Sequence, residues 1–457
     1  EETFLSPITL KKIDYEIDFT NLSNILANFK LEFSVNSSEF SSIPLNLPNS
    51  EYYFRSGGYW FVEFDDWIIY GSGADIIEEK FLFIDSIKLW DGKEIPYFHK
   101  GDILTLFFPY KFKKGDLIRI NIIYGGNIFE PTPDMSYYIN LTGLSWFPNP
   151  LQGYESVNCL FSGKLKCKKP FYAFGSFDNF ELKEENDILI LEGKSKYPEN
   201  YHSIAVGKYF PKSKKILDKF DITVASAVFP NESAYETFFG LSEGIFDFYE
   251  YFLKGYPYKH LNIIEGRGTG WGHAPPGIVY VSSEVYNPYF HYSSVGSNQL
   301  FAHEVAHQYF GHLVRISKFE DTWLEEALAE YISVFWYGRA KGKREFKSIY
   351  SYWYNNAKKA NDKASIYARG LISGENSGRY YWDLTYCKGP VLIHSIRKKV
   401  GDQTFFTLLR SFLRSFEHKQ VITSDLIGLL EFLTKESWKD FFDKYLYGME
   451  MPKKEKN

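Results

Sequence analysis

Two histidines four residues apart are the first residues in this chain that could do chemistry. Residues 303–307 read H-E-V-A-H and lie in an apolar stretch without proline over 296–314, which predicts a helix. On a helix, positions i and i+4 share a face, so His303 and His307 can offer two imidazole nitrogens to one metal ion. Glu304, beside them, is placed to handle the proton of a water molecule at that metal. Such a motif also arises by chance, so a metal site is indicated only if the chain also supplies a third ligand.

A carboxylate suited to be the third ligand follows His307 after eighteen intervening residues. This is Glu326, on a second predicted helix over about 322–339. Glu330, one turn later on the same face, could accept the second N–H of a ligand imidazole and fix its tautomer, or it could be a surface carboxylate. Both helices carry small residues that allow close approach, namely Ala302, Ala306, Ala327 and Ala329.

A different third ligand would be a histidine six residues after His307. That arrangement, H-E-x-x-H-x-x-G-x-x-H, requires glycine at position 310 and histidine at 313. The chain has phenylalanine and leucine there, while Gly311 and His312 each lie one place out of register. Glu326 is therefore the better third ligand, and His312 is predicted to be structural or near the rim of the cleft.

These motifs together resemble the signature of the M1 (gluzincin) zinc aminopeptidases. The family pattern is H-E-x-x-H, eighteen residues, and then a glutamate in a W-L-N-E-G-like segment, which here reads W-L-E-E-A over 323–327. A later family motif, Y-x-K-G, matches residues 386–389. The resemblance is strong over about 295–400 and weaker elsewhere. It implies a hydrolase with one Zn²⁺ per chain and a peptide substrate.

The resemblance also implies a role for each matched residue. His303, His307 and Glu326 would hold the metal, and Glu304 would be the general base. Tyr386, from the Y-x-K-G motif, would donate a hydrogen bond to the tetrahedral oxyanion. A non-catalytic binding protein on a peptidase scaffold is the alternative from another class, but it predicts the loss of one of these five residues, and all five are present.

Two departures from the family pattern concern substrate recognition. The family's G-x-M-E-N loop supplies a glutamate for the free α-amino group, and the aligned residues Gly272, His273 and Ala274 place alanine there. The favoured function is still release of N-terminal residues. The alternative is an endopeptidase or altered specificity, unless Glu326 or another acid such as Glu265 or Glu284 takes the amine.

The second departure is that the chain stops near residue 450. A short form without the family's large C-terminal helical domain is expected, with a more open cleft. The first residue is glutamate rather than methionine, which suggests removal of an upstream segment and slightly favours an extracytoplasmic location, although the compartment stays open.

The composition excludes several other classes of protein. A net charge of −5 gives no reason to expect a nucleic-acid partner, and no apolar run is long enough to be an integral membrane segment. The oligomeric state is not indicated. Three cysteines form no disulfide framework, although Cys159 and Cys167 could pair across a hairpin.

The elements that must position the site divide the chain in two. Residues 1–205 predict a β-rich domain, an antiparallel sandwich or saddle, from short apolar runs at 13–19, 29–35, 59–64, 80–87, 103–108, 117–124, 171–174, 188–192 and 202–209. Residues 206–450 predict a thermolysin-like catalytic domain, helical from about 340, and 451–457 a tail. The fold class is therefore α+β with two domains.

Overall fold

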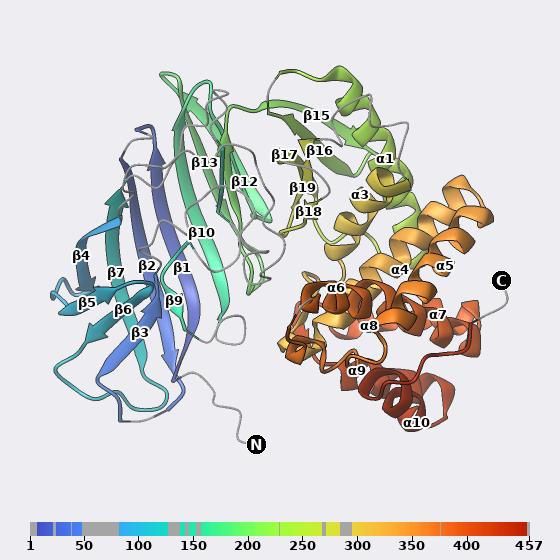
Figure 1. Cartoon of the computed structure of the whole chain (residues 1–457). Helices are drawn as coiled ribbons and strands as arrows, with labels where there is room; N and C mark the ends of the chain where they lie inside the picture. The colour runs from blue at the N-terminus through green and yellow to red at the C-terminus, as the bar shows by residue number, and fades with distance from the viewer. Residues whose placement is uncertain are drawn as a thin grey trace.

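The structure, a computed structural model, shows a β-rich layer beside a mixed sheet and a group of helices (Figure 1). It describes residues 7–21, 24–37, 39–47, 82–126, 138–141, 146–151, 157–227, 229–266, 271–283, 295–374 and 376–454, with the backbone alone for 138–141 and 295–297. The strand predicted over 59–64 lies outside the described residues. The α+β fold with a β-rich N-terminal half and a helical C-terminal half is confirmed.

A seven-stranded sheet is the largest N-terminal layer, in the order β12-β13-β10-β1-β2-β7-β4. Its strands are β1 (Ile8–Phe19), β2 (Ile25–Val35), β4 (Leu82–Leu89), β7 (Leu117–Gly126), β10 (Val157–Lys168), β12 (Asn179–Glu185) and β13 (Ile188–Lys194). Along β2 nearly every second side chain is buried, because successive side chains of a strand point to opposite faces. The prediction of a wholly antiparallel sheet is wrong, because β1 and β10 run parallel.

Two smaller sheets complete the N-terminal half. One has the order β5-β6-β3-β9 and the other β11-β14-β8. Their strands are β3 (Ser42–Asn46), β5 (Tyr97–Lys100), β6 (Ile103–Phe107), β8 (Tyr138–Leu141), β9 (Asn149–Pro150), β11 (Tyr172–Gly175) and β14 (Ile204–Gly207). Leu45, Leu104 and Leu106 belong to the same buried core as the large sheet, so the first of these small sheets packs on it.

A five-stranded mixed sheet begins the second half, in the order β15-β16-β17-β19-β18. Its strands are β15 (Phe210–Ile216), β16 (Phe220–Ser226), β17 (His260–Gly266), β18 (Gly272–His273) and β19 (Ile278–Ser282). β16, β17 and β19 are parallel, and helix α1 (Glu232–Phe252) is the crossover between the first two. Every residue of β17 and β19 is buried, as expected of parallel strands covered on both faces. β18 is an edge strand. The predicted domain boundaries stay a prediction.

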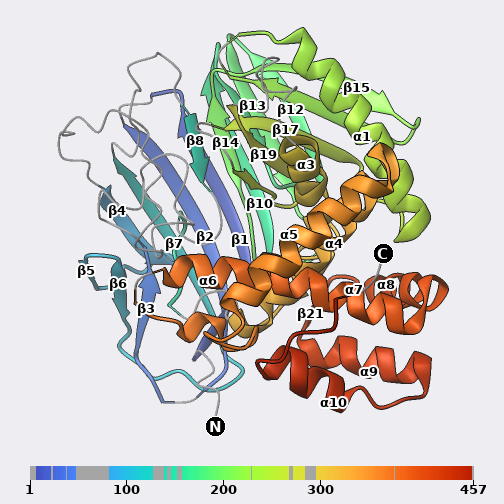
Figure 2. The same cartoon turned by 45° about the vertical axis from the view of Figure 1, so that its right-hand side comes forward.

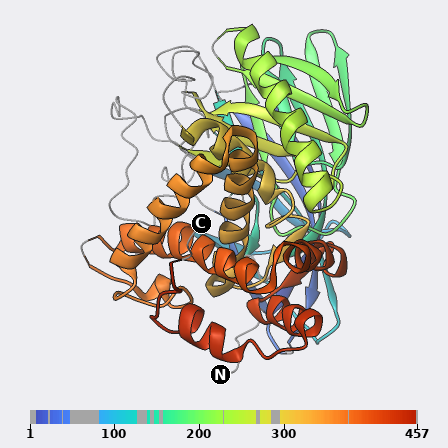
Figure 3. The same cartoon turned by 90° about the vertical axis from the view of Figure 1, so that its right-hand side faces the viewer.

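The remaining chain is mostly helical. The α-helices are α3 (Val295–His307), α4 (Thr322–Lys341), α5 (Lys343–Ala360), α6 (Ser377–Trp382), α7 (Gly389–Val400), α8 (Asp402–Ser415), α9 (Thr423–Thr434) and α10 (Lys439–Phe442). Two π-helical segments are η6 (Asp383–Lys388) and η7 (Asp443–Tyr447), and a parallel pair is formed by β20 (Val314–Ile316) and β21 (Lys419–Val421). Figures 2 and 3 show the orange and red helices below the green and yellow layers. In the described part of the chain, no helix could span a membrane.

Two local predictions were wrong. The helix expected over 296–314 ends at His307, because the chain turns back at Gly311, where φ is +125°, to enter β20. Cys159 and Cys167 lie on the same strand, β10, so they do not face each other across a hairpin, and both are free thiols. The prediction of helical structure over 386–400 is confirmed, with residues 386–388 in the π-helical segment η6 and the α-helix beginning at Gly389.

Candidate metal centre and active site

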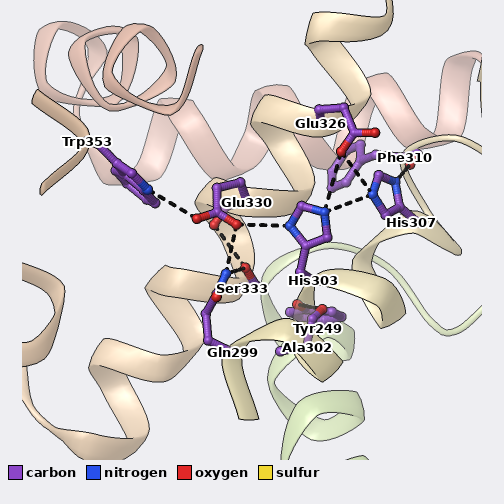
Figure 4. Close-up of polar contacts among 10 residues, drawn as sticks. All are labelled: Tyr249, Gln299, Ala302, His303, His307, Phe310, Glu326, Glu330, Ser333 and Trp353. Atoms are coloured by element: carbon purple, nitrogen blue, oxygen red, sulfur yellow. Dashed lines mark hydrogen bonds and ion pairs between the residues drawn. The ribbon is translucent and has the colours of Figure 1, made fainter. Parts of the chain in front are cut away.

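His303 and His307 of α3 and Glu326 of α4 converge on one point (Figure 4). The Nε2 atoms of His303 and His307 are 3.0 Å apart, and Glu326 Oε2 lies 3.4 Å from the first and 3.2 Å from the second. His303 is buried, and the side chains of His307 and Glu326 are 14% and 22% exposed. Within the described residues, this is the group of histidine and acidic side chains whose donor atoms could share a metal ion.

The outer nitrogens of both imidazoles are already used. His303 Nδ1 donates to Glu330 Oε2 at 3.0 Å, and His307 Nδ1 donates to the Phe310 carbonyl at 3.0 Å. A neutral imidazole carries one proton, so both Nε2 atoms are left with lone pairs that face each other. Buried Glu326 Oε2, which has no hydrogen-bond donor, faces the same point.

The two Nε2 lone pairs and the Glu326 oxygen repel one another, and a cation between them would remove this repulsion. Two imidazole nitrogens and one carboxylate oxygen, with a fourth position open, are the donor set of catalytic zinc sites. Tetrahedral ligands about 2.0 Å from zinc lie about 3.3 Å from one another, close to the three separations found here. The residues therefore fit Zn²⁺. The surrounding charge also favours a cation: burial lowers the pKa of His303, but the Glu326 and Glu330 carboxylates raise it well above its usual value.

Glu330 is the best-held carboxylate of the site. Its Oε2 accepts from Gln299 Nε2 at 2.8 Å as well as from His303, and its Oε1 accepts from Trp353 Nε1 at 3.1 Å (Figure 4). The structure thus places Glu330 where the sequence predicted it, and not on the surface. Gln299 and Trp353 were missed by the sequence analysis, since their partner is 31 and 23 residues away and no motif marks them.

Small residues explain how the site's elements approach each other. An added Cβ on Gly389, the glycine of the Y-x-K-G motif, would lie 2.8 Å from the Ala327 Cβ on α4. Glycine at one position and alanine at the other therefore allow the Tyr386 segment to pack against the helix that carries Glu326. This close contact gives a physical reason for the small residues in both motifs.

Glu304, the predicted base, packs against the edge strand of the mixed sheet. The side chain is buried, and an added Cβ on Gly272 would lie 2.6 Å from Glu304 Oε1. Burial raises the pKa of Glu304, while the imidazoles of His303 and His307 lower it. Only a residue without a side chain at position 272 leaves room for this carboxylate.

Tyr386 lies close to His303. Its ring is 6.1 Å from that imidazole, centroid to centroid, and η6 carries it into the site. Burial, followed by the charge of Glu326, holds the pKa of the Tyr386 hydroxyl well above its usual value. The hydroxyl is therefore protonated at neutral pH and able to donate a hydrogen bond.

The loop aligned with the family's amine-binding loop contains no acid among its described residues. His273 Nε2 is 2.5 Å from the Tyr201 hydroxyl, which comes from the N-terminal half. Burial lowers the pKa of His273 to about 3, so the ring is neutral. The Ala274 side chain is buried in the core, and its carbonyl accepts a hydrogen bond from His312 Nε2. His312 is thus a structural residue of this loop.

The other acids considered for the substrate's amine have different surroundings. Glu265 is buried and its Oε2 accepts from the Ala227 backbone N–H at 2.8 Å, so it fastens one loop of the sheet. Glu284 lies outside the described residues. A further acid, Glu325, precedes the candidate ligand Glu326 and packs near Gly311. Burial, followed by the Glu326 charge, raises the pKa of Glu325 to about 8.

Comparison with known proteins agrees with this fold and this donor set. Residues 290–445 match the Peptidase family M1 domain. The solved M1 zinc metallopeptidase of Deinococcus radiodurans superposes with a TM-score of 0.72 over 98% of this chain and 95% of that one, at 16% identity, which shows the common fold.

Among curated proteins, Aminopeptidase N of Lactococcus lactis subsp. lactis is 25% identical over 290 residues, which are 59% of this chain and 33% of that protein. Probable aminopeptidase 2 of Sulfurisphaera tokodaii is 22% identical over 345 residues, 72% of this chain and 42% of that protein. The chain thus spans well under half of the length of either relative.

The fold matches that of the solved two-domain M1 metallopeptidases. Residues 290–445, which the M1 family model matches, contain His303, His307, Glu304, Glu326, Glu330 and Tyr386.

Proposed function

We propose that this protein is a zinc-dependent peptidase that releases N-terminal residues from peptides. The observation that carries the proposal is the convergence of His303, His307 and Glu326 on one point. Glu304 and Tyr386 lie close to these ligands. The aminopeptidases among its relatives support the choice of reaction. The three ligands would hold one Zn²⁺ per chain.

When bound, zinc supplies a Lewis acid that polarises the scissile carbonyl and makes a water molecule more acidic. Glu304 accepts the proton of the attacking water and passes it to the leaving amine. Gly272 leaves the space that this carboxylate occupies. Glu330, through His303 Nδ1, keeps the ligand nitrogen deprotonated and correctly oriented.

Tyr386 stabilises the negative charge that develops on the carbonyl oxygen. Its hydroxyl keeps its proton because burial raises its pKa, so it can act as a donor throughout the reaction. The edge strand β18 (Gly272–His273) would pair with the extended substrate backbone. With Ala274 buried, we propose Glu326 as the described carboxylate that holds the substrate's α-amino group.

The test compares amino-acyl aminocoumarin substrates with their N-acetylated counterparts, using wild-type protein and Glu304→Gln. We expect the free amines to be cleaved at least tenfold faster, and Glu304→Gln to lose roughly 10²- to 10⁴-fold in kcat while keeping its zinc. Glu243→Gln, an exposed glutamate on α1, is the matched control. Faster cleavage of the acetylated substrates would refute N-terminal release, and wild-type rates in Glu304→Gln would refute the assigned base.

A further inference from the structure

Strand β12 (Asn179–Glu185) is an open edge of the seven-stranded sheet (Figure 1). In the described part of the chain it pairs with β13 alone. Each of its residues is exposed. Because the backbone polar groups of a strand point alternately to its two sides, about half of those in β12 face away from β13. These groups are a template for pairing with another strand.

Two apolar side chains of β12 lie on the core side of the sheet but are largely uncovered. Leu182 is opposite Leu191 of β13, and residues directly opposite each other share a face. Leu191 is buried in the core, whereas Leu182 is 49% exposed. Phe180, on the same face as Leu182, is 45% exposed, although its ring meets that of His260 at 4.8 Å. The core side of the sheet therefore extends beyond the residues that cover it, and a partner could bury apolar area there.

A second copy of the chain is the partner that the sequence of β12 fits. Two β12 strands can run antiparallel about a two-fold axis, which brings residues of the same face opposite each other. With the axis at Leu182, Glu181 lies opposite Lys183 of the second copy, and the reverse pair forms on the other side of the axis. An axis at Glu181 or at Lys183 places identical charges opposite each other instead. The first of these three registers is therefore the favourable one.

The same two charges interact within one strand of the single chain. Lys183 Nζ lies 3.1 Å from Glu181 Oε2. Pairing across the axis exchanges these contacts for contacts between strands, so the ion pairs select the register and add little to the affinity. The favourable free energy comes from the new backbone hydrogen bonds and from the burial of Leu182 and Phe180.

The outer strand of the five-stranded sheet lacks this self-complementarity. β15 contains Pro211, which has no backbone N–H to donate. An axis at Ser213 would place Lys212 opposite Lys214 of the second copy, and an axis at either lysine would also oppose like charges. The β15 edge is therefore protected against self-pairing, and the β12 edge is not.

We propose that β12 is the contact surface of a homodimer, in which two copies join their large sheets edge to edge about a two-fold axis at Leu182. This inference goes beyond the proposed function and does not depend on it. A single short edge strand buries less area than a standard protein interface, so we expect the dimer to dissociate on dilution.

Leu182→Cys tests the register directly. Opposed residues of antiparallel strands have Cα atoms about 4.5–5.5 Å apart, which is within the range of a disulfide. The native cysteines, Cys159, Cys167 and Cys387, are all buried. We expect mild oxidation of the full chain to link most of this variant into covalent dimers, measured on a non-reducing gel. Phe432→Cys, at an exposed position on α9, is the matched control and should stay monomeric.

Sedimentation velocity over a concentration series compares the wild type with two charge variants. Glu181→Lys places lysine opposite Lys183 of the second copy and should weaken association by roughly tenfold. Adding Lys183→Glu reverses both charges and should restore the association. A wild-type chain that stays monomeric throughout the series, or a dimer that Glu181→Lys leaves unchanged, would overturn the proposal. So would a Leu182→Cys variant that cross-links no more than Phe432→Cys.

Discussion

Single glycines decide how closely the reacting groups of this site can approach. Gly272 faces the Glu304 carboxylate, and Gly389 faces Ala327, which follows the proposed metal ligand Glu326 in the chain. In each case an added Cβ would lie under 3.0 Å from a neighbouring atom, closer than packed carbon atoms tolerate. A methyl group at either position must therefore displace something that the proposed reaction needs.

Gly272→Ala is the sharper of these two tests. The new Cβ would lie 2.6 Å from Glu304 Oε1 and 2.7 Å from its Cγ, so the carboxylate must rotate away. We expect kcat to fall by roughly 10²-fold or more with zinc retained, because a misplaced base loses most of its effect. Steady-state kinetics and metal analysis measure this.

Gly240→Ala is the control for Gly272→Ala. Gly240 lies in α1 with no atom within 4 Å of an added Cβ, so alanine there should leave the rate unchanged. A Gly272→Ala protein with the wild-type kcat would contradict the inferred contact between position 272 and the base.

The sequence predicts those parts of the site whose residues lie close together along the chain or in a motif of fixed spacing. The i, i+4 spacing of His303 and His307 is a property of one helix, and the sequence shows it. The structure brings Glu326 to the same point and Glu330 to His303, as the motif spacing predicted. Gln299, Trp353 and the role of Gly272 depend on packing between distant segments, which periodicity does not encode.

At the scale of elements, the residue after α3 holds the loop of the mixed sheet that follows β18. Gln308, directly after His307, is fully buried. Its Oε1 accepts from the Gly277 backbone N–H at 2.8 Å, and its Nε2 donates to the carbonyls of Pro275 at 3.0 Å and Ile278 at 3.3 Å. One amide thus fastens the loop that follows β18 to the metal-binding helix.

Gln308→Leu should loosen this loop and weaken the fold. Leucine has a similar volume but leaves the Gly277 N–H buried without its acceptor, at a cost of about 1–3 kcal/mol. We expect that loss in chemical denaturation, together with a rise in KM larger than the fall in kcat, because the binding edge moves more than the metal. Gln403→Leu, at an exposed site on α8, should change stability by less than about 0.5 kcal/mol. Equal stability of the two variants would contradict this account.

The sequence predicts the elements better than their ends. Strong periodicity predicted α1 and α4 and most of the strands, but the prediction carried α3 through to 314 and missed the π-helical form of η6. In both places, contacts with other parts of the fold determine the local backbone structure. The chain must turn at Gly311 so that Phe310 offers its carbonyl to His307, and the π-helical segment carries Tyr386 toward His303.

At the scale of the whole molecule, Arg315 joins three distant segments. It is 3% exposed and lies on β20, just beyond the metal helix. Its guanidinium donates to the Pro198 carbonyl, to Asn158 Oδ1 at 3.3 Å and to the His418 carbonyl at 2.9 Å. The N-terminal half, the metal-binding segment and the C-terminal helices therefore meet at one cation, which restricts how far the two halves can move apart.

A second buried cation, Lys388, joins the Tyr386 segment to the C-terminal end of the described chain. Its side chain is fully buried and its ammonium donates to the Gly448 carbonyl at 3.4 Å. No carboxylate is hydrogen-bonded to Lys388 among the described residues, so the cost of burying its charge is poorly compensated. Burial lowers the pKa of Lys388 to about 8.

This buried charge predicts a pH-dependent stability. Between the folded pKa of about 8 and the ordinary value of 10.5, the unfolded chain binds more protons than the folded one. Folding stability contributed by this group therefore rises with pH across that window, by about 3 kcal/mol in full. Below pH 8 the folded protein bears the whole cost of the buried charge.

Lys388→Met removes the charge and keeps the apolar stem. At pH 7 we expect the variant to be more stable than the wild type by about 1–3 kcal/mol, because the gain exceeds the lost hydrogen bond to Gly448. The advantage should shrink steadily between pH 8 and pH 10.5, as the wild-type lysine loses its proton. Lys398→Met, at an exposed position on α7, should show no such trend in urea unfolding at the same pH values. A stability difference for Lys388→Met that stays constant from pH 7 to pH 10 would mean that the folded protein does not penalise this charge, and that its burial is compensated.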